Sequence, residues 1–245
     1  MGEAKRKKLI DASKPSAQAI AVDQREMMAE ALRRVVGAVT DFHGADCIMY
    51  AQIGAELLLR QGLDAKRVAG GASWRVGPGD GDVVSHVGSL SMVVGAPVGV
   101  EYGAMFHAWI EVGDTLIDFT THSLRDKAGQ LDDMDGGHTQ VDWAPPYLWI
   151  DRANCQSHKA VAMAPGAGGF SYVRNSDIEK LVFADVLADE DVQYLADGVE
   201  MAMRMMAAGQ ELKIIGVGGA VLQDADTARF MSRARGVARF DTPRG

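Results

Sequence analysis

The chain has 245 residues, a formal net charge of −8 and an isoelectric point near 5.2, and 47% of its residues are hydrophobic. This length is enough to bury a core, as one large domain or a core domain with an appendage. The acidic balance excludes a nucleic-acid backbone as a general partner. The short basic cluster from Lys5 to Lys8 is expected to be solvated, within a flexible tail over residues 1–17.

The two cysteines are too few for a disulfide framework and fit a reducing compartment, where a lone cysteine serves either packing or chemistry. No apolar run in the sequence approaches the roughly 18 residues of a membrane span. No apolar stretch follows the N-terminal charges, as it would in a secretory signal. The sequence therefore predicts a cytoplasmic protein that has no membrane partner.

Two helices are expected in the first quarter of the chain. Residues 22–39 carry apolar side chains at helical spacing, and residues 47–60 form the second helix. Asp46 is a suitable N-cap for this second helix, with Arg60 in its last turn and Gly62 as its stop. Because this helix is apolar nearly all round, we expect it to be buried against a sheet.

The middle of the chain is typical of strands separated by turns. Short apolar runs bounded by glycine, proline and aspartate predict strands over 66–76, 86–95, 103–112 and 115–120. An acidic loop is expected over 126–138, and an extended segment over 144–149, where the prolines disfavour helix. Loops over 77–85, 96–104 and 121–146 are expected to determine pocket specificity.

The C-terminal part is expected to be mostly helical. Ser176 and Glu179 form a capping box ahead of one helical segment. A longer helix over roughly 189–208 contains several methionines, which we expect to fill a core. We therefore expect a core over 18–160 and, packed on the same domain, an extension over 165–245.

A hairpin in the middle of the chain collects polar side chains on one face. A two-residue Gly113-Asp114 turn pairs the strands on either side of it. His107 and Asp118 then become diagonal neighbours, close enough for the carboxylate to orient the imidazole. By strand alternation the polar face carries His107, Trp109, Glu111, Leu116, Asp118 and Thr120. The other face is expected to pack inward and carries Phe106, Ala108, Ile110, Ile117 and Phe119.

Cys47 follows the N-cap of the buried helix, where backbone N–H groups and the macrodipole favour an anion. This position lowers the pKa of a thiol and predicts an exposed, reactive cysteine. If the start of the helix meets the polar face of the hairpin, His107 can activate the thiol and Asp118 can orient His107. The backbone N–H of Cys47 can then help to hold an oxyanion.

These residues resemble the transglutaminase-like superfamily of papain-fold enzymes, and the match covers about residues 43–121. The first half of the matched segment is similar to three features of the family: an apolar helix that begins with a cysteine and has an alanine four residues later, a Leu-Arg-x-Gly turn, and the start of a strand. Here these features are Cys47 and Ala51, Leu59-Arg60-Gln61-Gly62, and Ala65-Lys66-Arg67-Val68. The second half is similar to its His-Ala-Trp-x-Glu-Val and x-x-Asp-x-Thr strands, at His107-Ala108-Trp109-Ile110-Glu111-Val112 and Leu116-Ile117-Asp118-Phe119-Thr120.

The resemblance implies an α+β fold with a papain/transglutaminase-like core, in which the buried helix carrying Cys47 packs on an antiparallel sheet. The C-terminal helices expected from the sequence pattern are extra to this core. It implies Cys47 as nucleophile, His107 as base and Asp118 as orienting acid. The implied chemistry is acyl transfer through a thioester, with hydrolysis of an amide or peptide bond as the expected outcome. The substrate would be a peptide or another amide-containing molecule, and no cofactor or metal is expected.

The sequence departs from the family pattern just before the cysteine. The residue that supports the oxyanion hole cannot be chosen among Asp41, Phe42 and His43. His43 is also a rival base, and together with Asp46 and Trp109 it is a candidate to line or support the substrate pocket. No counterpart is recognised for residues 165–245.

Other functions remain open at this point. An amine acceptor would make the chain a transglutaminase or an N-acyltransferase. An arylamine N-acetyltransferase-like enzyme shares the Cys-His-Asp order, but this chain lacks the Arg-Gly-Gly-like segment before the cysteine. Alternatively, the fold is a non-catalytic binding or scaffold module, and the C-terminal region covers the cleft or docks a protein partner.

The remaining candidate ligands favour ordinary structural roles. Cys155 and His158 could be half of a zinc site, but no second pair of suitable spacing is present in the sequence. The acidic cluster lacks the spacing of a calcium loop and is expected to be solvated, at Asp132, Asp133 and Asp135. His122 and His138 could approach the site from its rim.

Overall fold

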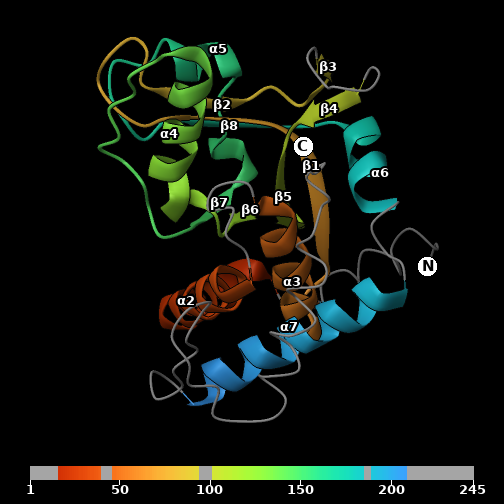
Figure 1. Cartoon of the computed structure of the whole chain (residues 1–245). Helices are drawn as coiled ribbons and strands as arrows, with labels where there is room; N and C mark the ends of the chain where they lie inside the picture. Colours follow the sequence, from red (N-terminus) through yellow and green to blue (C-terminus); the bar gives the residue numbers. More distant parts are fainter. Residues whose placement is uncertain (1–15, 40–45, 94–100, 185–188, 209–245) are drawn as a thin grey trace, which may run out of the picture.

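The structure is a computed structural model of the whole chain and describes residues 16–39, 46–93, 101–184 and 189–208 (Figure 1). The expectations for most of the basic tail, for Asp41, Phe42 and His43, and for the residues after 208 lie outside this part. The described chain has an α+β fold, in which helices pack around a curled antiparallel sheet. None of its helices has the length and apolar character needed to cross a membrane.

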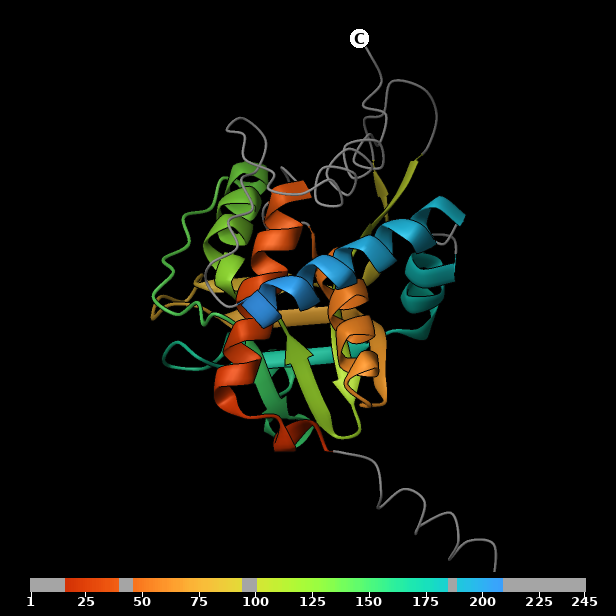
Figure 2. The ribbon, with the colours of Figure 1, turned by 90° about the horizontal axis from the view of Figure 1, so that it is seen from below.

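Three long helices pack together on one side of the sheet. The short helix η1 (Ala17–Ala19) precedes α2 (Val22–Val39), and both α2 and α3 (Cys47–Arg60) have the expected bounds. Figure 2 shows α7 (Asp189–Ala208) lying across α2 and α3, and it contacts both helices. Two of the α7 methionines are buried in the core as expected, whereas Met203 is exposed.

The long strand β1 (Ala65–Arg75) holds most of the sheet together. Its first half pairs with β5 (His107–Val112), and its second half pairs with both β2 (Val83–His86) and β8 (Phe170–Arg174). All of these pairs are antiparallel. One strand therefore brings together segments from three distant parts of the sequence.

Backbones come very close where β5 and β8 meet β1. Gly70 of β1 pairs with His107 of β5 and with Arg174 of β8. A Cβ atom at this position would lie against the carbonyl oxygen of Val173, and 2.7 Å from the backbone nitrogen of Asn175. Only glycine therefore fits at position 70.

The expected hairpin is present with its expected register. β5 pairs with β6 (Thr115–Asp118) through Glu111–Leu116 and Val112–Thr115, and the turn begins at Gly113, whose φ is 58°. The positive φ explains why glycine comes first in this turn. β6 then pairs with β7 (Leu148–Asp151), which completes the sheet.

Two of the expected strands are each divided in the structure. The run over 86–95 is divided between the end of β2 and β3 (Ser89–Val93), because Gly88 has a φ of 64°. The run over 103–112 is divided at Phe106 into β4 (Glu101–Met105) and β5. β3 and β4 pair with each other in a separate two-stranded sheet.

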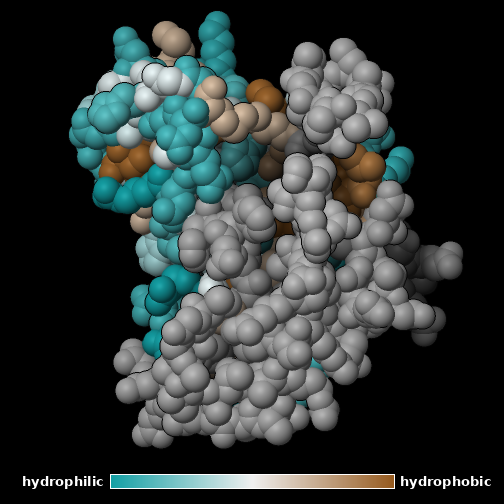
Figure 3. All heavy atoms as spheres, viewed as in Figure 1, coloured by the Kyte–Doolittle hydropathy of each residue, from teal (hydrophilic) through white to brown (hydrophobic). Residues whose placement is uncertain are grey.

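The expected acidic loop over 126–138 is wrong, because most of it is helical. After η2 (Thr121–Ser123), α4 (Leu124–Asp135) continues to a left-handed C-cap at Gly136. One side of α4 is buried, with Leu124, Ala128 and one charged residue on it. The visible surface around α4 is mostly hydrophilic (Figure 3). This amphipathic pattern explains why α4 forms despite its acidic composition.

The segments after β7 add short helices to the same fold. They are η3 (Arg152–Asn154), α5 (His158–Ala162) and α6 (Ser176–Ala184). The side chain that caps α6 belongs to Asn175 rather than Ser176, because it accepts from the backbone N–H groups two and three residues further on. β8 lies beyond the expected boundary of the core, yet it pairs with β1.

The hairpin is buried on both faces. Ala108, Ile110 and Ile117 belong to the core shared with α2 and α3, while Trp109 and Leu116 belong to a second core on the other face. Every residue of β5 and β6 is buried. The polar face therefore lies inside the molecule, where its polar groups need protein partners.

Candidate active site

Cys47 is the first residue of α3 and lies close to the start of β5. The helix packs closely on the apolar face of the hairpin, because a Cβ atom at Gly54 would be 2.8 Å from Cδ1 of Ile110. The cysteine belongs to the same core and is only 5% exposed. A hydrogen bond from the backbone of Ala108 reaches its sulfur. The thiol therefore lies beside the residue that follows His107.

The expected low thiol pKa is wrong for this conformation. Burial raises the pKa of Cys47 to about 11, although the positive charge of Lys127 and the hydrogen bond from Ala108 act in the opposite direction. Asp46 occupies the N-cap position, but its side chain makes no capping hydrogen bond, and its negative charge also raises the pKa of the thiol. The helix start alone is therefore too weak to offset the loss of water.

His107 and Asp118 make the contact that the hairpin register predicts. Nε2 of His107 and Oδ2 of Asp118 are 2.9 Å apart, and both side chains are fully buried. Nδ1 of His107 is buried and has no hydrogen-bond partner among the described residues. One nitrogen of the ring is thus held by a carboxylate, and the other remains available.

Four hydrogen bonds surround the carboxylate of Asp118. Oδ1 accepts from the backbone N–H and the hydroxyl of Thr120, both at 2.8 Å, and Oδ2 accepts from the hydroxyl of Tyr172 at 2.7 Å as well as from His107. Burial alone would raise the pKa of Asp118, but His107 and Lys127 outweigh it and hold the pKa well below its usual range. Asp118 is therefore a carboxylate, which can fix the orientation of the imidazole.

His107 itself is held in the neutral form. Burial lowers the pKa of the imidazole, and the positive charge of Lys127 lowers it further, while Asp118 raises it without reversing the result. A neutral imidazole can accept a proton at one nitrogen while its other nitrogen donates to the carboxylate.

The main residue that the sequence analysis did not identify is Lys127 on α4. Its side chain is buried, and Nζ donates to Oγ1 of Thr120 at 2.6 Å and to the carbonyl oxygen of Thr120 at 3.4 Å. The ammonium also lies 5.0 Å from the centre of the Trp74 ring. The apolar spacing of Leu124 and Ala128 is the sequence signal that could have placed Lys127 on the buried side of a helix.

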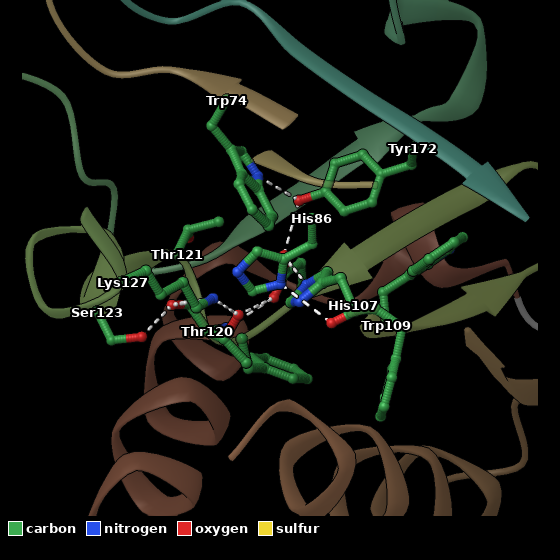
Figure 4. A network of polar contacts seen from close by, with 12 residues as sticks. Trp74, His86, His107, Trp109, Thr120, Thr121, Ser123, Lys127 and Tyr172 are labelled. Atoms are coloured by element: carbon green, nitrogen blue, oxygen red, sulfur yellow. Dashed lines mark hydrogen bonds and ion pairs between the residues drawn. The ribbon is translucent and has the colours of Figure 1, made fainter. Parts of the chain in front are cut away.

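Aromatic residues from three further strands surround the imidazole (Figure 4). Nε1 of Trp74 on β1 donates to the hydroxyl of Tyr172 on β8 at 2.8 Å. The ring of His86, at the end of β2, lies 5.8 Å from that of His107, and its Nδ1 is 3.0 Å from the carbonyl oxygen of Phe106. Burial lowers the pKa of His86 to about 3, so this second imidazole is neutral too.

The expected support residues have mixed outcomes. Trp109 stacks on His107 at a ring-centroid distance of 6.3 Å, and its Nε1 donates to Glu111 at 3.1 Å. Glu111 in turn pairs with Arg152. His43 lies outside the described residues. Trp109 is therefore part of the wall around the imidazole.

The histidines expected at the rim lie in different places. His122 contacts the hydroxyl of Tyr50, one turn after Cys47, at 3.4 Å, while His138 is exposed in the loop after α4. His158 contacts the hydroxyl of Ser85 at 3.2 Å. In the described ranges, no three side chains of the metal-binding types come together. Asp132 accepts from the backbone and the hydroxyl of Thr139 and so closes its own loop.

The space between α3 and the hairpin is closed among the described residues. A narrow gap there is lined by Tyr50, Ala108 and Asp118, among others, and has no room for a water molecule. A larger groove lies between α2, α7 and the segment around Tyr147, but its lining includes neither Cys47 nor His107. Among the described residues, the candidate active site is thus closed to solvent.

No protein-family model matches the chain, and no curated protein matches it. One solved structure, the crystal structure of a genomics target, is similar to it in fold. That similarity has a TM-score of 0.52 and 15% sequence identity, and it covers 76% of this chain and 80% of the other. At this identity the likeness concerns the fold alone.

Proposed function

We propose that the chain is a cysteine-dependent acyl-transfer enzyme with a papain/transglutaminase-like core, whose reaction is the hydrolysis of an amide or peptide bond. Cys47 is the nucleophile, His107 the base and Asp118 the residue that orients the base. The observation that carries the proposal is the buried His107–Asp118 pair at 2.9 Å. The second ring nitrogen of His107 has no other partner among the described residues, and the Cys47 sulfur lies beside the next residue of the strand.

The chemistry follows from these positions. Nδ1 of His107 takes the proton of the thiol, and the sulfur attacks the carbonyl carbon of the substrate. The backbone N–H of Cys47, at the start of α3, can donate to the oxygen that becomes negative. The protonated imidazole then gives its proton to the leaving amine, and a thioester remains. Water, deprotonated by His107, cleaves the thioester and restores the thiol.

The closed site sets a condition on this proposal. A thiol that is 5% exposed, with a pKa raised to about 11, is not a nucleophile at neutral pH. The proposal therefore requires an opening of the structure around Cys47 that admits the substrate. Hydration of the sulfur in the open form would remove the main cause of the raised pKa.

The same burial favours one alternative, a non-catalytic binding or scaffold module. In that case the His107–Asp118 pair is a buried polar contact that specifies the fold, and Cys47 is a packed apolar side chain. The two functions differ in whether Cys47 reacts while the chain is folded.

The test uses p-nitrophenyl acetate as the acyl donor and intact-mass measurement after acid quenching. We expect one acetyl group per chain, located on Cys47 and released by neutral hydroxylamine as a thioester is. Cys47→Ala should lose the label completely, whereas Cys155→Ser should keep it. His107→Ala should slow labelling by about a hundredfold or more.

Two results would contradict the proposed enzymatic function. Equal labelling of the Cys47→Ala variant would assign the reaction to another residue. Labelling of wild-type Cys47 only at the rate of global unfolding, measured in parallel by circular dichroism, would favour the scaffold module instead.

A further inference from the structure

Lys127 carries a buried ammonium group without an ion-pair partner within 4.0 Å in the described part of the chain. Its side chain is 1% exposed, and its ammonium contacts two oxygens of Thr120 and the face of the Trp74 ring. A buried charge with so little direct compensation costs free energy unless another charge lies nearby. The burial of Lys127 beside the candidate active site is therefore explained if its charge serves the site.

The ammonium is joined to the imidazole by a continuous chain of hydrogen bonds. Nζ of Lys127 donates to Oγ1 of Thr120 at 2.6 Å, and the same hydroxyl donates to Oδ1 of Asp118 at 2.8 Å. The other oxygen of Asp118 holds His107. Because Oγ1 accepts from the ammonium, its proton is directed at the carboxylate. Lys127 thus fixes the side of Asp118 that faces away from His107.

The charge of Lys127 also acts on the rest of the site. The titratable groups that interact with this charge come from five strands and helices. They are Cys47 and its N-cap residue Asp46 at α3, His86 on β2, His107 on β5, Asp118 on β6 and His122 on η2. Its positive charge favours a thiolate at Cys47 and disfavours a proton on His107. Burial lowers the pKa of Lys127 itself, and the negative charge of Asp118 raises it.

We propose that Lys127 is a positioning residue that also contributes charge to the site: it anchors Asp118 through Thr120, and its ammonium favours the thiolate form of Cys47. This inference rests on the acyl-transfer function proposed above. It assigns to α4, which lies outside the sequence resemblance, the cation that balances the thiolate. Lys127 need not touch the substrate.

The test is the pH dependence of Cys47 alkylation by iodoacetamide, measured on the full chain between pH 7 and 10 by peptide mass spectrometry. All variants carry Cys155→Ser so that only Cys47 reacts. Lys127→Met removes the charge and keeps a long side chain. Lys159→Met is the matched control, because it removes one positive charge from an exposed position on α5.

The sign of the effect separates charge from packing. If Lys127 supplies the charge, Lys127→Met slows alkylation at pH 8 about tenfold relative to the wild type and to Lys159→Met. If Lys127 only fills space, its loss hydrates the site and speeds alkylation, because burial is the main cause of the raised pKa of Cys47. An unchanged or faster reaction in Lys127→Met overturns the proposal.

Lys127→Arg keeps the proposal falsifiable if Lys127→Met does not fold. Arginine stays protonated over this pH range, whereas the buried lysine loses its proton as the pH rises. The ratio of the Lys127→Arg rate to the wild-type rate should therefore increase towards pH 10, and parallel profiles would overturn the proposal. A wild-type Cys47 that is unreactive at every pH would overturn the proposed function as well, which distinguishes the two failures.

Discussion

The two faces of the β5–β6 hairpin are equally buried but are stabilised in different ways. On the α3 side, Ile110, Ile117 and Phe119 make apolar contacts with the helix. On the α4 side, His107 and Asp118 are buried together with a lysine, a threonine and a tyrosine, and each polar group is tied to another by hydrogen bonds. Apolar contacts are individually replaceable, whereas a buried hydrogen-bond network fails when one member is removed.

Strand alternation identifies which residues of the hairpin share a face, but it does not identify which elements cover that face. The cover of the polar face comes from α4 and β8, which follow the hairpin in the chain and carry Lys127 and Tyr172. The cover of the apolar face comes from α3, whose apolar character is visible in the sequence itself. The next three experiments test this difference.

The largest loss of folding stability is expected on the polar face, for Asp118→Ala. Removing the carboxylate leaves His107, Thr120 and Tyr172 without their shared partner, and breaking a buried ionic network costs about 3–5 kcal/mol. Urea unfolding followed by circular dichroism measures the change in the free energy of unfolding. Asp118→Asn, which keeps an acceptor for Thr120, should cost less. If Asp118→Ala lowers the free energy of unfolding by less than about 1 kcal/mol, the network contributes little to stability.

A smaller effect is expected on the apolar face, for Gly54→Ala. The added methyl group would lie 2.8 Å from Cδ1 of Ile110 and 3.2 Å from the Phe119 ring, and overpacking of this kind costs about 1–3 kcal/mol. Ile110→Val in the same chain should recover part of this loss, because it removes the atom that clashes. A double-mutant cycle in urea measures the recovery. Additive losses would contradict tight packing of α3 on the hairpin.

The smallest effect concerns the pH dependence of stability. His86 has its pKa lowered to about 3 by burial, so the folded chain disfavours a proton that the unfolded chain binds below about pH 6.5. Its contribution to stability is therefore complete above that pH and is lost as the pH falls towards 3. His86→Asn keeps a donor for the carbonyl of Phe106 but does not titrate.

Unfolding midpoints in urea at pH 7.5 and pH 5.5 measure this contribution. The free energy of unfolding should differ less between the two pH values in His86→Asn than in the wild type. The slope of this free energy against pH should change by at most about 1.4 kcal/mol per pH unit, the linkage of one proton. An equal difference in both chains would mean that His86 is hydrated or charged when folded.

The local parts of the fold and site were accessible from the sequence. The bounds of α2 and α3, the register of the hairpin and the contact between His107 and Asp118 follow from periodicity and from one glycine turn. These features depend on residues that are close in sequence. Local chemistry is therefore enough to predict them.

The remaining features depend on tertiary contacts. Cys47 is buried because α3 packs on the hairpin in the shared core, and this burial reverses the expected shift of the thiol pKa. The roles of Lys127 and Tyr172 require α4 and β8 to reach the hairpin from later in the chain. The acidic composition of α4 favours the prediction of a loop, although the spacing of Leu124 and Ala128 indicates a helix with one buried side.

Gly70 gives the site a dimension that does not depend on side-chain packing. It joins the strand that begins with His107 to the strand that contains Tyr172, and the backbone around it leaves no space for a side chain. The spacing of the strands that carry His107 and Tyr172, two of the donors to Asp118, is therefore set by the width of the main chain. Substitutions in either core can alter stability without changing this spacing.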